Sequence, residues 1–242
     1  MKVSEKINMD KAELYDNGPI NIVVFGDSIT HGSFNGYNNY EAVYWNLLKQ
    51  KLNQFRDDIP VNIINAAIGG TTAFRSLGRI ERDVLSHHPD LIIICFGLND
   101  VNKELSQYTS SLKIIFSKCI ESGAEVIFMT PNMLNTYIAD DTPLEWIDYS
   151  AKTMVFQNEG RLDEYINEAI KTAEEMGVKV CDCYKEWKKL YESGVDTTKL
   201  LSNRINHPTE EMHKLFADML FNIIITENDF KSPERINTMF EK

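Results

Sequence analysis

A chain of 242 residues is long enough to bury one large hydrophobic core without disulfides or metals. Its formal net charge of −11 disfavours nucleic acids and anionic membranes as partners, because both attract basic proteins. Hydrophobic residues make up 43% of the chain and charged residues 25%, a balance that excludes disorder except near the ends.

Apolar runs alternate with helical patterns along the chain. The predicted strands are 20–25, 61–65, 91–96, 125–129 and 178–182. The predicted helices are about 40–55, 73–86, 104–121, 162–176, 184–191 and 208–225. The third strand is apolar at every position, as in a parallel sheet covered on both faces. This alternation predicts an α/β fold, a three-layer α/β/α sandwich with a mainly parallel five-stranded sheet.

Two stretches fall outside the alternation. Residues 132–158 form a long connection that contains Trp146, Tyr149 and Phe156, and connections of this length are usually functional or disordered. The charged tail from about residue 228 is expected to wrap the surface or fray. We therefore expect one domain over residues 1–242, with its core in about 20–222.

The N-terminus and the cysteines bear on the compartment. The first ten residues contain no apolar segment, and no apolar stretch approaches the length of a membrane span. The four cysteines form no CxxC pair and have no histidine at zinc-finger spacing, so we expect free thiols. These features predict a cytoplasmic location and no membrane partner, provided that no targeting signal has been removed.

Polar residues follow three of the predicted strands at their carboxyl ends, where parallel α/β sheets hold their sites. A fourth group precedes the last helix. Taken singly, Ser28 indicates a helix cap, Gly69 and Gly70 a tight turn and Asn99 a local turn. Together at one sheet edge, the serine can supply a nucleophile, a glycine a backbone donor, the asparagine a side-chain donor and His207 a base. The segments are Gly26-Asp27-Ser28, Asn65 through Gly70, Gly97-Leu98-Asn99-Asp100 and Asn206-His207-Pro208.

These four segments resemble the signature blocks of the SGNH hydrolase superfamily, also called GDSL esterases and lipases. The resemblance covers residues 20 to about 222, and it implies a flavodoxin-like SGNH fold. It implies that Ser28 is the nucleophile and His207 the base. The implied oxyanion hole consists of the N–H of Ser28, the N–H of Gly70 and the side chain of Asn99, with Gly69 as the alternative to Gly70. Ester hydrolysis of this kind requires no metal or organic cofactor.

The sequence departs from the family beside the base. The family usually has an aspartate three residues before the histidine, but Arg204 occupies that position here. A backbone carbonyl of Asn203 or Arg204 could hold the imidazole and give a Ser-His dyad, the explanation that we favour. An acid from elsewhere could reach the ring, or the enzyme could be impaired. The candidate acids are Asp182, Asp196 and Glu210.

The substrate is predicted less sharply than the chemistry. We expect a small-molecule ester with a short acyl group, acetyl foremost, on a carbohydrate-like or other small alcohol. Candidate substrate contacts are Asp27, Arg204, Trp146 and Tyr149. For Arg204 we favour a surface arginine paired with an acid over a contact with an anionic substrate group. For Trp146 and Tyr149 a local aromatic cluster is as ordinary as a contact with a sugar. The alternatives are a lysophospholipase- or thioesterase-type hydrolase, and a binding module without catalysis. His31, His87, His88 and His213 are given no catalytic role.

Overall fold

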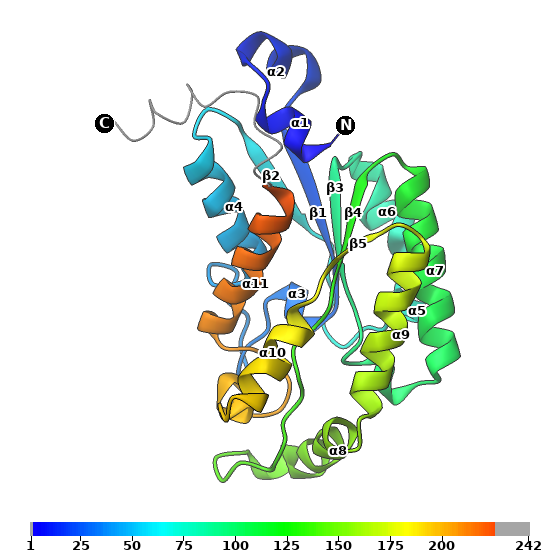
Figure 1. The fold of residues 1–242 in the computed structure, drawn as a ribbon, viewed down its shortest axis with the longest axis vertical. Helices are drawn as coiled ribbons and strands as arrows, with labels where there is room; N and C mark the ends of the chain where they lie inside the picture. The colour runs from blue at the N-terminus through cyan, green and yellow to red at the C-terminus, as the bar shows by residue number, and fades with distance from the viewer. Residues whose placement is uncertain (1, 226–242) are drawn as a thin grey trace.

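The computed structural model describes residues 2–225 and places a parallel sheet between two layers of helices (Figure 1). The five strands lie in the order β2-β1-β3-β4-β5, and every neighbouring pair is parallel. Their bounds are β1 (Ile20–Gly26), β2 (Val61–Asn65), β3 (Leu91–Cys95), β4 (Glu125–Met129) and β5 (Lys179–Cys181). The predicted α/β sandwich is therefore confirmed.

The central strand β3 shows why the sheet needs two covering layers. All five of its residues are buried, and they pair with β1 on one side and β4 on the other. An apolar strand of this kind is stable only when helices cover both faces.

Helices α4 and α11 cover one face of the sheet, and α5, α6, α7 and α9 cover the other (Figure 1). The longer helices are α4 (Tyr44–Phe55), α7 (Leu105–Glu121), α8 (Ile147–Asn158), α9 (Arg161–Glu175), α10 (Cys183–Glu192) and α11 (Glu210–Ile224). The short ones are α1 (Val3–Ile7), α2 (Lys11–Asn17), α3 (Ser28–His31), α5 (Ala73–Ser76) and α6 (Ile80–Asp83). Single 3-10 turns are η1 (Leu77–Arg79), η2 (Leu85–His87), η3 (Asp100–Asn102), η4 (Leu144–Trp146) and η5 (Thr197–Leu200).

The N-terminal helices α1 and α2 were not predicted, because five and seven residues are too few for a clear helical period. They lie at the amino end of the sheet (Figure 1). The Lys6 ammonium binds the Asp90 carboxylate at 2.8 Å and the Pro19 carbonyl at 2.9 Å, and both charged side chains are buried. A buried ion pair thus joins α1 to the amino end of the sheet.

The predicted helix over 73–86 is broken into α5, η1, α6 and η2. Gly78 lies in its middle, where glycine weakens a helix. Arg79 points its guanidinium inward to the Ala66 carbonyl, behind the end of β2. The breaks thus place a buried cation against the loop that follows β2.

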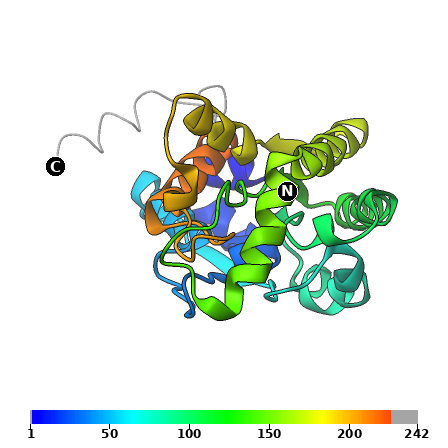
Figure 2. The same ribbon diagram turned by 90° about the horizontal axis from the view of Figure 1, so that it is seen from below.

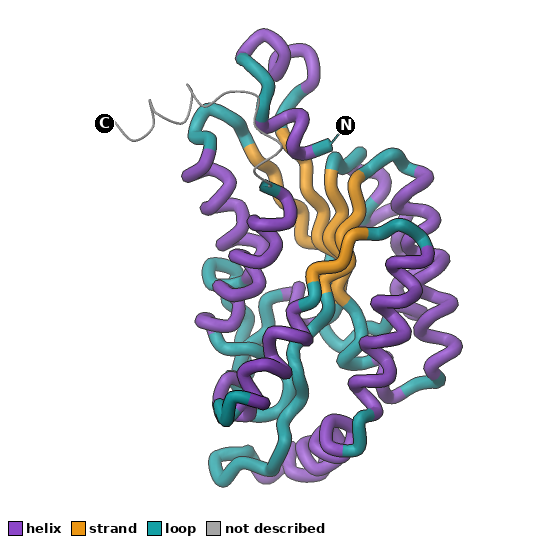
Figure 3. The backbone as a smooth tube through the Cα atoms, viewed as in Figure 1, coloured by secondary structure: helices purple, strands orange, loops and turns teal. Residues whose placement is uncertain are grey.

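The connection over 132–158 is half helical, and the expectation of a long loop is wrong from Leu144 onward. Buried Asn135 organises it by donating to the Ser150 carbonyl at 3.0 Å and accepting from the Thr153 hydroxyl at 2.6 Å. Seen from below, α8 lies in front of the carboxyl ends of the strands (Figure 2). Most loops gather at the same end (Figure 3).

Two further expectations concern the compartment. No helix within residues 2–225 is long and apolar enough to cross a bilayer. The four cysteines are free and buried, as expected. The cytoplasmic location stays a prediction, and the predicted tail from residue 228 lies outside the described residues.

Candidate active site

The nucleophile candidate Ser28 is the first residue of α3, directly after β1. The N-cap is Asp27, whose carboxylate accepts from the Ile29 N–H at 3.0 Å, so Ser28 is not the capping residue. Gly26 makes the turn possible, because a Cβ there would lie 2.6 Å from the Cys95 carbonyl oxygen. The Ser28 hydroxyl is therefore left for other partners.

His207 lies beside Ser28, although the two are 179 residues apart in the chain. Its Nε2 is 3.1 Å from the Ser28 Oγ, and its Nδ1 is 2.7 Å from the carbonyl oxygen of Phe34. A carbonyl oxygen can only accept, so Nδ1 carries the proton and donates it to Phe34. Nε2 is then the unprotonated nitrogen, and it accepts from the Ser28 hydroxyl. This is the tautomer that a general base requires.

The carbonyl that holds His207 comes from a hairpin directly after α3. Ser33 and Asn38 form an antiparallel bridge, and the Phe34 N–H donates to the Tyr37 carbonyl at 2.8 Å. Gly36 turns the chain with a φ of 77°, a left-handed conformation that favours glycine. The Phe34 ring is buried and packs on the His213 ring with their centroids 5.0 Å apart. The position of the carbonyl thus depends on a short hairpin with a buried aromatic anchor.

Asn203 shapes the loop that carries His207. Its side-chain oxygen accepts from the N–H groups of Ile205, Asn206 and His207 at 2.9–3.1 Å. Its amide nitrogen lies 3.3 Å from His207 Nδ1, a longer contact than the one with Phe34. Asn203 therefore fixes the backbone that presents the imidazole.

Arg204 points away from the imidazole, with its backbone at a φ of 59°. The guanidinium binds Asp141 at 3.1 Å and the carbonyls of Lys199 and Leu201 at 3.1 and 2.9 Å. The favoured interpretation, an arginine paired with an acid, is confirmed. Its guanidinium ties the loop of the base to the 132–158 connection.

The partner of His207 was predicted in the wrong place. The carbonyl belongs to Phe34 and not to Asn203 or Arg204. The candidate acids are all engaged elsewhere within the described chain: Asp182 caps α10, Asp196 accepts from the Tyr137 hydroxyl at 2.8 Å, and Glu210 accepts from the Asn39 side chain.

Burial lowers the pKa of His207 below its usual value of 6.5, and the bond to the Phe34 carbonyl opposes the shift. The imidazole is therefore neutral at neutral pH and is available as a base.

The loop after β2 presents one glycine N–H that is free. The Gly69 N–H donates to the His31 Nδ1 at 3.3 Å, whereas the Gly70 N–H has no acceptor among residues 2–225. Gly70 adopts a φ of 71°, which favours glycine. A donor that has no acceptor in the free protein can bind an oxyanion without first breaking a hydrogen bond. The hydrogen bonding thus favours Gly70 over Gly69.

Asn99 follows β3 and points its amide nitrogen toward the same region. The nitrogen donates to Asp27 Oδ2 at 3.3 Å and to the Thr71 carbonyl at 3.1 Å. Asp27 is completely buried, so our expectation that it contacts substrate is wrong. It lies under the site and orients Asn99, and burial raises its pKa to about 7.

A second buried carboxyl lies next to the first. Asp100 Oδ1 accepts from the Ala73 N–H at 2.9 Å, and its other oxygen has no hydrogen-bond partner in the described chain. Burial, with a contribution from the charge of Asp27, raises the pKa of Asp100 to about 7. Asp27 thus holds the Asn99 side chain, and Asp100 holds Ala73 at the end of the glycine loop.

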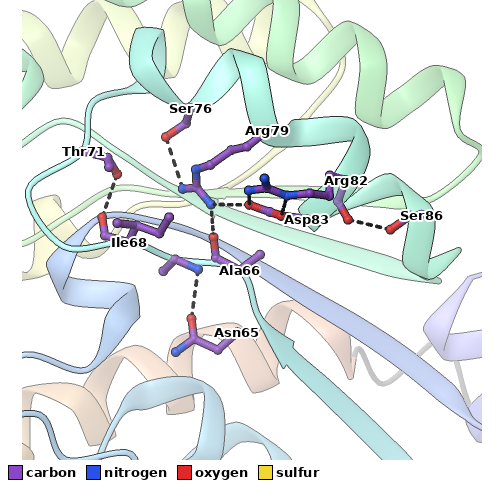
Figure 4. A network of polar contacts seen from close by, with 10 residues as sticks. Asn65, Ala66, Ile68, Thr71, Ser76, Arg79, Arg82, Asp83 and Ser86 are labelled. Carbon is purple, nitrogen blue, oxygen red and sulfur yellow. Dashed lines mark hydrogen bonds and ion pairs between the residues drawn. The ribbon is translucent and has the colours of Figure 1, made fainter.

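Arg79 supports the glycine loop from behind (Figure 4). Its guanidinium donates to the Ala66 carbonyl and to the Ser76 hydroxyl, and it stacks 4.6 Å from the Phe25 ring centroid. The Thr71 hydroxyl closes the loop onto the Ile68 carbonyl at 2.7 Å. These contacts fix both sides of Gly70 while its N–H stays free.

Trp146 and Tyr149 lie on the segment that crosses the carboxyl ends of the strands. Their ring centroids are 6.2 Å apart, and Trp146 is 52% exposed. Burial raises the pKa of the Tyr149 hydroxyl, and the charge of Asp27 raises it further.

The sequence matches the model of the GDSL-like lipase/acylhydrolase family over residues 24–215. The chain belongs to this family. Its fold is similar to that of the acetylxylan esterase Axe2 from Geobacillus stearothermophilus, with a TM-score of 0.68 and 19% identity over 88% of this chain and 97% of that one. It is also similar to the acetyl xylan esterase AlAXEase, with a TM-score of 0.66 and 24% identity over 85% of this chain and 100% of that one.

Two curated proteins match shorter segments. An arylesterase of Vibrio mimicus is 32% identical over 111 residues, 45% of this chain and 52% of its own length. The uncharacterized lipoprotein YqeF of Bacillus subtilis is 40% identical over 81 residues, 33% of this chain and 31% of its own length. The matched segments thus span about a third to a half of these relatives.

Proposed function

We propose that this protein hydrolyses esters of short acyl groups, acetyl foremost, with a carbohydrate-like or other small alcohol, using Ser28 and His207 as a dyad. The observation that carries the proposal is the hydrogen-bonded series from the Phe34 carbonyl through the imidazole to the Ser28 hydroxyl, at 2.7 and 3.1 Å.

The first step is attack by the Ser28 oxygen on the ester carbonyl carbon. His207 Nε2 takes the hydroxyl proton as the oxygen–carbon bond forms. The imidazolium that results is positive, and the Phe34 carbonyl stabilises it by accepting from Nδ1–H. A neutral carbonyl gives less charge stabilisation than a carboxylate would, but it fixes the same tautomer and ring orientation.

The tetrahedral oxyanion is stabilised by the N–H groups of Ser28 and Gly70 and by the Asn99 amide. Both N–H bonds of that amide are engaged in the free protein. The negatively charged oxygen replaces the neutral Thr71 carbonyl as acceptor, because charge-assisted hydrogen bonds are stronger. Asp27 keeps the amide oriented during the exchange.

The reaction ends by three proton transfers. His207 returns its proton to the alcohol oxygen as the acyl bond breaks, leaving the acyl group on Ser28. The imidazole then takes a proton from the water that attacks the acyl-enzyme, and it returns this proton to the Ser28 oxygen as the acyl–oxygen bond breaks and the carboxylic acid leaves.

Two observations support a short acyl group on a sugar-like alcohol. The folds of two acetylxylan esterases are similar to this one, and aromatic rings of Trp146 and Tyr149 lie on the segment over the site. Rings of this kind present flat apolar faces together with a polar edge.

The dyad is tested by hydrolysis of p-nitrophenyl acetate by the wild type, Ser28→Ala and His207→Ala. Loss of either residue should lower kcat by up to about 10⁶-fold, because nucleophile and base act as a unit. Labelling by a fluorophosphonate probe should disappear in Ser28→Ala. Undiminished turnover in both variants would refute the proposal.

The acyl preference is tested with p-nitrophenyl esters from acetyl to palmitoyl. We expect kcat/KM to be highest for acetyl and to fall with chain length. A maximum at eight carbons or more would favour a lipase or lysophospholipase instead.

A further inference from the structure

His31 occupies a position between the nucleophile and the glycine loop that the proposed dyad does not use. It ends α3, three residues after Ser28, and it is half-buried. Its Nδ1 accepts from the Gly69 N–H at 3.3 Å, and its Nε2 lies 3.2 Å from the Tyr40 hydroxyl. The ring therefore bridges the loop after β2 and the segment after the Phe34 hairpin.

The contact with Gly69 defines which nitrogen of the neutral ring carries the proton. A backbone N–H can only donate, so Nδ1 must be the unprotonated nitrogen. In the neutral ring the proton is then on Nε2, which donates to the Tyr40 oxygen. His31 acts as an acceptor toward the glycine loop only in this form.

Gly69 is hydrogen-bonded to His31 and lies close to the nucleophile. A Cβ added to Gly69 would lie 3.5 Å from His31 Nδ1 and 3.8 Å from Ser28 Cβ. The Asn65 side chain adds a second link between α3 and the loop by donating to the His31 carbonyl at 3.4 Å. The loop is thus attached to the helix that begins with the nucleophile.

Two consecutive glycines have more backbone freedom than any other pair of residues, so the peptide between Gly69 and Gly70 needs a fixed neighbour. We propose that His31 is a positioning residue for the oxyanion hole: it anchors Gly69 so that the Gly70 N–H is aimed at the oxyanion. It also occupies the Gly69 N–H, which leaves Gly70 as the glycine donor. The inference rests on the ester hydrolysis proposed above.

A matched pair of substitutions tests this role. Leucine and asparagine have similar size and shape, but only asparagine offers an oxygen near the position of Nδ1. His31→Leu should lower kcat for p-nitrophenyl acetate about tenfold with KM unchanged, a fraction of the 10²–10³-fold cost of removing an oxyanion donor outright. His31→Asn should restore kcat to within about threefold of the wild type, because it keeps the acceptor for Gly69.

The thermal midpoint of each variant separates positioning from stability. The proposal requires that the leucine variant stay folded at the assay temperature and lose kcat relative to the asparagine variant. Equal kcat values in the two variants, or a loss that falls on KM, would overturn it. Ser28→Ala is assayed in parallel: if it keeps full activity, the proposed esterase mechanism fails, whereas a dead Ser28→Ala beside a fully active His31→Leu refutes only the role of His31.

Discussion

The two sides of the candidate active site are built differently. The oxyanion side rests on buried ionisable groups, since Asp27, Asp100 and Arg79 hold Asn99, Ala73 and Ala66, respectively. On the base side the groups next to the imidazole are neutral, because His207 is held by the Phe34 carbonyl and its backbone by the Asn203 side chain. In the family the base usually has a carboxylate behind it, so the neutral side is the one that departs from the common pattern.

The difference shows which requirement the fold has kept. A carbonyl fixes the imidazole tautomer as well as a carboxylate does, and it adds no charge to the site. The cost of having a carbonyl is a less stable imidazolium, because a neutral acceptor stabilises its positive charge less than a carboxylate does. On the oxyanion side, where negative charge develops, the Gly70 N–H has no acceptor within residues 2–225, and the Asn99 amide can exchange the neutral Thr71 carbonyl for the oxyanion.

Removing the side-chain donor tests the oxyanion side and should have the largest effect among the variants that compare the two sides. Asn99→Leu keeps the volume of the side chain and removes its N–H groups. We expect kcat for p-nitrophenyl acetate to fall about 10²–10³-fold with little change in KM, because the donor acts mainly in the transition state. An unchanged kcat would reduce Asn99 to a residue that joins Asp27 and the Thr71 carbonyl.

The sequence predicted where the candidate residues of the oxyanion side lie in the fold. Ser28, Gly70 and Asn99 belong to the segments that follow β1, β2 and β3, and the carboxyl ends of parallel strands meet at one edge, so local patterns were sufficient. Asp27 and Asp100 adjoin these residues in the chain, but a sequence does not show which side of the backbone is buried. The sequence therefore predicts a substrate contact at Asp27, whereas in the structure its carboxylate is buried beneath the site.

The base side could not be predicted in the same way. His207 was recognised by its place before the last helix, but the group that binds its Nδ1 is a main-chain oxygen 173 residues earlier. Every residue has such an oxygen, so no residue type marks it. His31 was missed for a related reason: its role depends on a contact with a glycine N–H of another loop. Asn203 does carry a signal, since asparagine often accepts from backbone N–H groups that follow it.

The pH dependence of kcat/KM distinguishes the two sides. Burial lowers the pKa of His207 below 6.5, whereas burial raises the pKa values of Asp27 and Asp100 to about 7. The base must be unprotonated, so activity is lost as the pH falls through the pKa of His207. A protonated Asp27 still offers an oxygen to Asn99. We therefore expect the acidic limb below pH 6.5.

The control for the pH profile is Asp27→Asn, which cannot titrate. Its acidic limb should coincide with that of the wild type if His207 sets it. A wild-type limb near pH 7 that shifts in Asp27→Asn would show instead that the buried carboxyl, and thus the oxyanion side, limits activity in acid.

Restoring the family's acid should have the smallest effect on the rate. In Arg204→Asp the new carboxyl starts from a backbone with φ of 59°, where the arginine side chain points toward Asp141. The Phe34 carbonyl already occupies the Nδ1 proton at 2.7 Å. We expect kcat to stay within about twofold of that of Arg204→Asn, a control that also removes the guanidinium but adds no charge and tolerates the left-handed backbone. Both variants should unfold at a lower temperature than the wild type, because each loses the bonds to Asp141, Lys199 and Leu201.

The two kcat values decide what the site requires of the group behind its base. If kcat of the aspartate variant alone rises tenfold or more, the carbonyl is a poor substitute for a carboxylate, and the base side lacks a charge that it could use. If the two variants have equal kcat, the site requires only that the imidazole be oriented, which the Phe34 hairpin already does.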